Sequence, residues 1–161
     1  MSAASNIQLF ENLLSRQISW ISAADSKASF VFGLNVAMAG VLVSSLPRRL
    51  SLLDKISSIT ISMYFVLFFV SIVFVVLVYF PRLNGSKESN LFFRNIISKE
   101  RSNFVKNMIN ISNDDICADM LDQIYINAGI ADSKFTWLKY SMIMNLISIT
   151  PWLLSIWFLL S

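Results

Sequence analysis

Three long stretches without a charged residue constrain the fold of this chain more than any other feature of its sequence. They run from Ala28 to Leu46, from Ile56 to Phe80 and from Tyr140 to Ser161. About 20 apolar residues in a helix match the roughly 30 Å hydrocarbon core of a bilayer. The sequence therefore predicts an all-α integral membrane protein, a single domain with three transmembrane helices.

The composition supports this class. Hydrophobic residues make up 55% of the chain and charged residues only 14%, whereas soluble domains carry about 25% charged residues. The middle stretch is apolar on every side from Met63 onward, and Ser71 is its one clear polar interruption. A helix that is apolar all round is lipid-facing or deeply buried, so we expect residues 56–80 to form a lipid-facing outer ring.

The basic residues are distributed unevenly along the chain. Ten of the 13 Lys and Arg residues lie in residues 1–27 or 81–139, and the remaining three, Arg48, Arg49 and Lys55, lie between the first two stretches. Cytoplasmic loops are enriched in Lys and Arg, which predicts a cytoplasmic N-terminus and an outward-facing C-terminus. Mixed-charge sequence before residue 28 and spans after it argue against a cleaved signal peptide.

Two of the spans are predicted to continue into the cytosol as long helices. Apolar residues recur at three- and four-residue intervals through residues 7–24, so we expect one helix from Asn6 to Ser45, stopped by Pro47. An alternative is that residues 1–27 lie flat on the membrane as an amphipathic helix. In the segment 81–139, a turn at 84–86 and short helices precede a long helix that Ser112 and Asp115 can cap.

No pattern in the sequence supports catalysis or metal binding. The chain has no His, one Cys and no glycine-rich phosphate loop, so neither a zinc site nor a nucleophile paired with a base is available. The acidic group Asp114, Asp115, Asp119 and Asp122 is interpreted as helix N-terminal charge and a solvated face. We expect a protein that is not an enzyme.

Polar residues at membrane depth are the candidate pore lining. Asn35 and Asn145 lie within the first and third stretches, where an amide costs free energy unless it meets a partner or water. Gly33, Ala37 and Gly40 are expected to share one stripe with Asn35, as pore lining or a close helix contact. The alternative is a hydrogen-bonded contact inside one subunit. Three spans cannot enclose a useful channel, so a pore would require a homo-oligomer.

Two four-residue segments resemble one another, and each precedes a span. Asp25 and Lys27 belong to the first, and Asp132 and Lys134 belong to the second. Side chains two residues apart point to different faces of a helix, so each is predicted to form ion pairs with a neighbouring helix or subunit. Chance recurrence of so short a segment is the simpler alternative.

The segment between the second and third spans combines cations with aromatic rings. Such side chains can bind phosphates and stack on bases, although a solvated basic face is the more ordinary interpretation. The candidate nucleotide-binding residues are Lys87, Phe92, Phe93, Arg94, Lys99, Arg101 and Lys106. Farther along, Pro151 lies within the third span, where it could introduce a kink. The alternative is an ordinary proline that the membrane helix tolerates.

Several short motifs, in order, resemble the Pycsar-type transmembrane effector family. The run Ala24-Asp25-Ser26-Lys27-Ala28, followed by a helix containing Asn35, is similar to that family's A-D-x-K-A motif and first membrane helix. Pro81 and the run Ser89-Asn90-Leu91-Phe92-Phe93 match a second landmark, without the Pro that often follows the Asn. Ile124-Tyr125 and Lys139-Tyr140 match a third. The resemblance extends from Phe10 to Leu146.

The resemblance implies an effector of bacterial anti-phage defence in the inner cell membrane. Such effectors lie beside a nucleotidyltransferase or cyclase and respond to its nucleotide messenger, and their output is loss of membrane integrity and growth arrest. Many members carry a separate cyclic-nucleotide-binding domain, for which this chain has no room. The ligand is therefore left open between a cyclic messenger sensed by residues 81–139 and a nucleotide oligomer. No cofactor is expected beyond that messenger.

Three functions remain open from the sequence. The first is a homo-oligomeric channel or pore-forming effector that a nucleotide messenger opens or holds closed. The second is a membrane-anchored regulatory module that binds a cytosolic partner. The third is a holin-like membrane protein that needs no ligand.

Overall fold

The structure is a computed structural model that describes residues 3–47, 54–81 and 89–160. Its elements are α1 (Ala3–Ser44), α2 (Lys55–Tyr79), α3 (Phe93–Ser98), α4 (Arg101–Ile109) and α5 (Asn113–Leu160). No strand occurs in these ranges, which confirms the all-α prediction for them. The expected turn at 84–86, Lys87 and the pair Arg48 and Arg49 lie outside the described residues.

Three of the helices are long and apolar enough to cross a membrane. They are Asn6–Ser44, Lys55–Tyr79 and Asn113–Leu160, and each contains the apolar window that a span requires. Length and composition alone establish this property. The three spans expected from the sequence therefore correspond to α1, α2 and α5.

The two long helices begin and end where the sequence predicts, within a few residues. α1 is uninterrupted from Ala3 to Ser44, and Pro47 follows its last turn. At the start of α5, the backbone N–H of Asp115 donates to Ser112 Oγ at 3.1 Å, and the Ser112 hydroxyl donates to Asp115 Oδ2 at 2.6 Å. The first bond satisfies the Asp115 N–H, one of the backbone donors that the first turn of a helix leaves open, and the second joins the two side chains. α5 also continues through Pro151 without a break.

The chain divides into two compact units, which are described separately. Unit 1 comprises Met1–Ala23 and Pro81–Ser133, and unit 2 comprises Ala24–Phe80 and Lys134–Ser161. The helices α1 and α5 each contribute one part to each unit. The three apolar stretches of the sequence lie entirely in unit 2.

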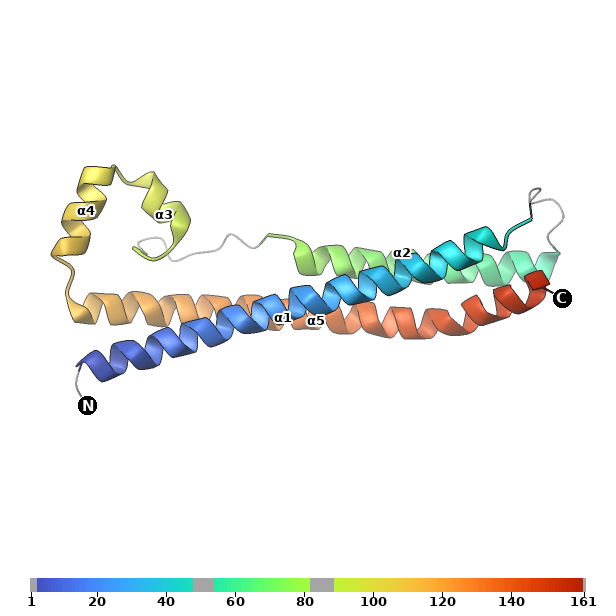
Figure 1. Cartoon of the computed structure of the whole chain (residues 1–161), viewed down its shortest axis with the longest axis horizontal. Helices are drawn as coiled ribbons and strands as arrows, with labels where there is room; N and C mark the ends of the chain where they lie inside the picture. The colour runs from blue at the N-terminus through green and yellow to red at the C-terminus, as the bar shows by residue number, and fades with distance from the viewer. Residues whose placement is uncertain (1–2, 48–53, 82–88, 161) are drawn as a thin grey trace. The chain divides into compact units, whose positions relative to one another are not determined.

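Unit 2 is a bundle of three helices, in which α2 runs antiparallel to the C-terminal parts of α1 and α5 (Figure 1). The buried positions recur every seven residues on each helix: 24, 31 and 38 on α1; 57, 64, 71 and 78 on α2; 134, 141, 148 and 155 on α5. A seven-residue repeat keeps the same face of each helix toward its neighbours when helices wind around each other with a left-handed twist. The bundle is therefore packed as a coiled coil.

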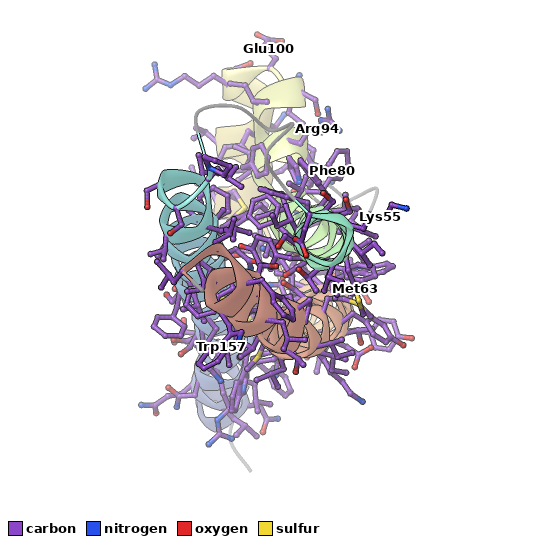
Figure 2. All side chains as sticks on the ribbon, turned by 90° about the vertical axis from the view of Figure 1, so that its right-hand side faces the viewer. Lys55, Met63, Phe80, Arg94, Glu100 and Trp157 are labelled. Atoms are coloured by element: carbon purple, nitrogen blue, oxygen red, sulfur yellow. The ribbon has the colours of Figure 1, made fainter. Side chains whose placement is uncertain are left out.

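Two apolar clusters hold the bundle together. One contains Ala28 and Val31 of α1, Val75 and Val78 of α2, and Leu138 of α5. The second gathers Met38, Leu42, Ile61 and Tyr64, with residues of α5 packed against them. Outside these clusters large apolar side chains remain exposed, and Figure 2 shows Met63 and Trp157 pointing away from the bundle on different sides. Such an apolar surface suits lipid.

Unit 1 is organised by a short turn that packs on α5. Ser89 Oγ accepts hydrogen bonds from the backbone N–H groups of Leu91 and Phe92, both at 3.0 Å, and from Gln123 Nε2 at 3.1 Å. The N–H of Asn90 donates to Asp119 Oδ2 at 2.7 Å. The run that resembles the family's N-x-L-F-F landmark therefore anchors this segment to α5, ahead of α3.

Candidate functional site

A band of polar side chains fills the interior of the bundle in unit 2. Its members are at most 4% exposed, although they occupy helices whose outer surface is apolar. We call this band the polar seam; it consists of Asn35, Ser57, Ser71, Ser141, Asn145, Ser148 and Ser155. Small and polar residues between membrane helices allow close approach and hydrogen bonding. The seam is the most unusual chemical feature of the bundle.

One hydrogen-bonded network in the seam joins all three helices. Asn35 Nδ2 donates to Ser71 Oγ at 3.1 Å, and the hydroxyl oxygens of Ser71 and Ser141 lie 3.1 Å apart. The backbone carbonyl of each of these two serines also accepts from the hydroxyl of the other, at 3.1 and 3.2 Å. Asn35 Nδ2 makes a second bond to the Val31 carbonyl at 2.9 Å. This crossing fixes the register of α1, α2 and α5.

The seam continues along α5 at helical spacing. Ser148 Oγ donates to the Asn145 carbonyl and Ser155 Oγ to the Pro151 carbonyl, both at 2.7 Å. Hydroxyls that bond their own helix remain satisfied without a partner on another helix. Because α2 is antiparallel and Ser71 meets Ser141, the seven-residue steps place Tyr64 at the level of Ser148, and Ser57 at that of Ser155.

Three buried polar atoms in this region have no hydrogen-bond partner among the described residues. They are Asn35 Oδ1, Asn145 Nδ2 and the hydroxyl of Tyr64. An unpaired buried donor or acceptor costs about 1–3 kcal/mol. An acceptor on α1, a donor on α5 and a hydroxyl on α2 thus retain unused bonding capacity inside the bundle.

The structure separates Asn35 from the small residues with which it was expected to share a stripe. Asn35 is buried, whereas Gly33, Ala37 and Gly40 are on the exposed side of α1. The expectation of one stripe was wrong because two residues turn a helix by about 200°. A Cβ at Gly33 or Gly40 would meet nothing within 4 Å. We call Gly33, Ala37 and Gly40 the small-residue ridge.

The two similar segments supply one ion pair between helices. Lys134 of α5 is buried and bonds the carboxylate of Asp25 on α1. Lys27 lies instead over the ring of Phe135, 5.4 Å from its centroid, a favourable cation–π arrangement. Asp132 belongs to unit 1 and is exposed. The Asp of the first segment thus pairs with the Lys of the second.

The candidate nucleotide-binding residues do not converge in unit 1. Arg94, Arg101 and Lys106 are exposed on α3 and α4. The rings of Phe92 and Phe93 pack against each other, with their centroids 4.9 Å apart. Only Lys99 lines the open pocket of about 770 Å³ in this unit, and its ammonium donates to Asn90 Oδ1 at 2.7 Å.

The charges around that pocket do not favour phosphate. Besides Lys99, its lining includes the carboxylates of Asp115, Asp119 and Asp122. Like charges within a few ångströms repel by about 1 kcal/mol or more, depending on exposure to water. These aspartates belong to the acidic group interpreted from the sequence as a solvated face. One of them, Asp119, also accepts a hydrogen bond from the N–H of Asn90.

Sequence reasoning missed several residues of the site. Ser57, Ser141, Ser148 and Ser155 were not singled out, nor was Tyr64, yet all are buried in the bundle. The available signal was the seven-residue spacing of the serines in α5. Trp152 of α5 is partly buried and donates from Nε1 to the Met38 carbonyl at 2.8 Å.

Three potential spans packed around buried serine and asparagine define a helical membrane protein with a polar interior. The chain belongs to the Pycsar effector family, because the profile of the Pycsar effector protein domain matches residues 9–161. It is similar to the Pycsar effector protein GmPycTM of Gulbenkiania mobilis, with 30% identity over 73% of this chain and 74% of that protein. No solved structure gives a significant match.

Family membership confirms the resemblance indicated by the motifs. The chain is a membrane effector of anti-phage defence, and it belongs with the effectors rather than with the enzymes that make a signal. The matched region includes all of unit 2, and with it the whole polar seam, and unit 1 from residue 9 onward.

Proposed function

We propose that this effector acts as a homo-oligomeric channel in the bacterial inner membrane, with the polar seam as the origin of its conducting path. A nucleotide messenger, cyclic or oligomeric, from a neighbouring nucleotidyltransferase or cyclase sets the open or closed state. Conduction dissipates ion gradients and so disrupts the membrane and arrests growth. The N-terminus lies in the cytoplasm and the C-terminus in the periplasm, in line with the distribution of Lys and Arg.

The observation that carries this proposal is the burial of seven polar side chains inside a bundle with an apolar exterior. Polar groups at membrane depth are costly and commonly mark ion or substrate pathways. Asn35, Asn145 and Tyr64 each keep an unused polar atom there. In a channel these atoms would meet water, which offsets their cost.

In this mechanism the described arrangement is the closed one. The Asn35–Ser71–Ser141 network holds α2 against α1 and α5, with direct bonds at 3.1 Å and no lumen between them. Opening separates α2 from the other two helices and turns the seam toward a lumen shared by several copies. Arg94, Arg101 and Lys106, which lie outside the acidic pocket, are the proposed contacts for the anionic messenger.

Ion flux from liposomes tests the channel. The full chain is reconstituted into liposomes that contain a trapped dye. Candidate messengers and a permeant ion are added outside, and the dye signal reports ion flux. Asn35→Leu should change the conductance and shift stability by less than about 1 kcal/mol, because membrane hydrogen bonds average roughly 0.6 kcal/mol. Ser62→Leu, at an exposed serine of α2 that bonds its own backbone, is the matched control and should conduct normally.

Three results would count against the channel. Vesicles that stay tight under every messenger condition would contradict it directly, and retention of a cytosolic enzyme by such vesicles would favour the regulatory anchor. Leakage that is equal with and without messenger would favour a holin-like protein. Equal conductance of wild type and Asn35→Leu would remove the seam from the path. Reporter fusions at the C-terminus test its periplasmic location separately.

A further inference from the structure

An apolar groove with a volume of about 690 Å³ runs between α1 and α5 in unit 2. Large side chains form its walls and two lysines lie on its border. The residues that carry the argument are Lys27 and Phe30 of α1 and Phe135, Lys139, Met142 and Leu146 of α5. Neither the seam nor the ridge lines it, so the groove is a separate feature of the bundle.

The two lysines mark one end of the groove. Lys27 and Lys139 each precede the apolar part of their helix, and α1 and α5 run parallel in unit 2. Within residues 3–47, 54–81 and 89–160, the one ion pair joins Asp25 and Lys134. The positive charges of Lys27 and Lys139 therefore have no carboxylate partner in these ranges.

We infer that this groove binds an anionic phospholipid from the leaflet into which the lysines open. Its phosphate lies between Lys27 and Lys139, and one acyl chain follows the groove past Phe30 and Met142 to Leu146. From Lys139 to Leu146 the helix rises about 10 Å, which is two thirds of a leaflet of about 15 Å. Charge at the surface and apolar walls below it match the two parts of a lipid.

A helix from a second copy fits the groove less well. Close helix contacts in membranes rely on small residues, whereas bulky side chains such as Phe30, Phe135 and Met142 line this groove. A second copy would also have to bring carboxylates to both lysines. A phospholipid supplies negative charge and a flexible chain in one molecule.

Native mass spectrometry of the full chain in nonionic detergent tests the site. Phosphatidylglycerol and phosphatidylcholine with identical acyl chains are titrated separately, so that the lipids differ only in the headgroup, which is anionic in the first and zwitterionic in the second. Each lysine near a membrane surface strengthens binding of anionic lipid about fivefold. Wild type should retain phosphatidylglycerol about 25-fold better than phosphatidylcholine at its first site, and the double variant Lys27→Gln/Lys139→Gln should lose that preference.

Two further variants sharpen the result. Leu146→Trp fills the groove and leaves both lysines, so binding of both lipids should fall. Arg16→Gln/Lys55→Gln removes the same charge from exposed basic residues elsewhere and should keep the wild-type preference. Thermal unfolding of each variant in detergent shows that it is folded, so that lost lipid reports on the groove.

The inference is overturned by equal retention of the two lipids in wild type, or by a preference that survives Lys27→Gln/Lys139→Gln. It is also overturned if glycerol 3-phosphate alone displaces phosphatidylglycerol at equal concentration, since the site would then bind only a small anion. Disulfide formation between copies through Phe30→Cys and Met142→Cys would put a second copy in the groove instead. None of these readouts depends on conductance, so this inference and the channel can fail independently.

Discussion

At the scale of single residues, the ion pair of Asp25 and Lys134 joins two charges that are buried to different degrees. The Lys134 side chain is 10% exposed and that of Asp25 is 36% exposed. Asp25 can therefore keep part of its hydration without its partner, whereas Lys134 cannot. The two halves of one ion pair should respond differently to substitution.

We predict that Asp25→Asn destabilises unit 2 by about 2 kcal/mol, because it leaves an unpaired buried ammonium, and partial exposure of the pair lowers the usual 3–5 kcal/mol. Lys134→Met should cost less than half as much. The double variant should resemble Lys134→Met alone, as a coupled pair requires. Unfolding of the purified protein by titration with a denaturing detergent measures all three, and additive costs would contradict the coupling.

The start of α2 should be sensitive to acid. Asp54 Oδ1 accepts from the N–H of Ser57 at 2.9 Å, and hydrogen bonding by Ser57 lowers the pKa of the Asp54 carboxyl below its ordinary value. A carboxyl with a lowered pKa in the folded state stabilises at pH values above its unfolded pKa. That stabilisation should disappear as the pH falls through the still lower folded pKa.

Hydrogen exchange at the Ser57 amide checks this prediction. Protection in wild type should fall as the pH drops below about 4, after correction for intrinsic exchange. Asp54→Ser keeps an oxygen acceptor for the helix start and removes the titrating group. Its protection should show no such step, and a step of the same size in both proteins would assign it to another group.

Asn35 shows how far the sequence reaches at this scale. Its position within an uncharged stretch predicted a polar group that needs a partner, and the structure gives it one in Ser71. The identity of that partner depends on the antiparallel register of α2, which no residue of α1 encodes. The same limit applies to Asp25, whose partner lies 109 residues away.

At the scale of elements, α2 has two faces rather than one. The sequence predicts a lipid-facing outer helix, and one side of α2 is exposed, but Ser57, Tyr64 and Ser71 are buried on the other. The scarcity of polar residues concealed this division because a nearly uniform helix gives no contrast between its faces. The seven-residue spacing of the buried positions was the remaining signal for the inner face. Using it requires knowing in advance which positions of α2 are buried.

A disulfide between α2 and α5 should lock the bundle. In a background with Cys117→Ser, we expect Ser71→Cys/Ser141→Cys to oxidise, because the native hydroxyls are 3.1 Å apart. The oxidised protein should lose messenger-dependent flux at least tenfold and regain it on reduction, since α2 separates in the proposed opening. The pair Ser62→Cys/Ser141→Cys, with Ser62 on the exposed side of α2, is the control. Undiminished flux in the locked protein would contradict opening by separation.

At the scale of the whole molecule, we propose the small-residue ridge as the surface on which the copies of the proposed homo-oligomer meet most closely. Gly33 and Gly40 have open space beside them, since a Cβ added at either position meets nothing within 4 Å in its own chain. A contact between membrane helices, in contrast, depends on such small residues. Substitution on the ridge therefore separates folding from assembly.

We predict that Gly40→Leu keeps the melting temperature of the monomer within about 2 °C and reduces the oligomer to monomer in detergent, with loss of flux from liposomes. Size exclusion with light scattering gives the mass. Val43→Leu, at an exposed position on the same helix, adds one methylene and should leave the assembly intact. An unchanged oligomer in Gly40→Leu would remove the ridge from the interface.

The opposite placement of Asn35 and the small-residue ridge makes α1 a helix with two distinct edges. Axial rotation by roughly half a turn, or about two residue steps of 100° each, would exchange the edge directed inward for the edge directed outward. Since α1 is one unbroken helix with residues in both units, a rotation of the whole helix about its axis would turn Asn35 together with the N-terminal residues. In the proposed channel, such a rotation would withdraw Asn35 from Ser71 as α2 separates, so the angular setting of α1 and the position of α2 should change together.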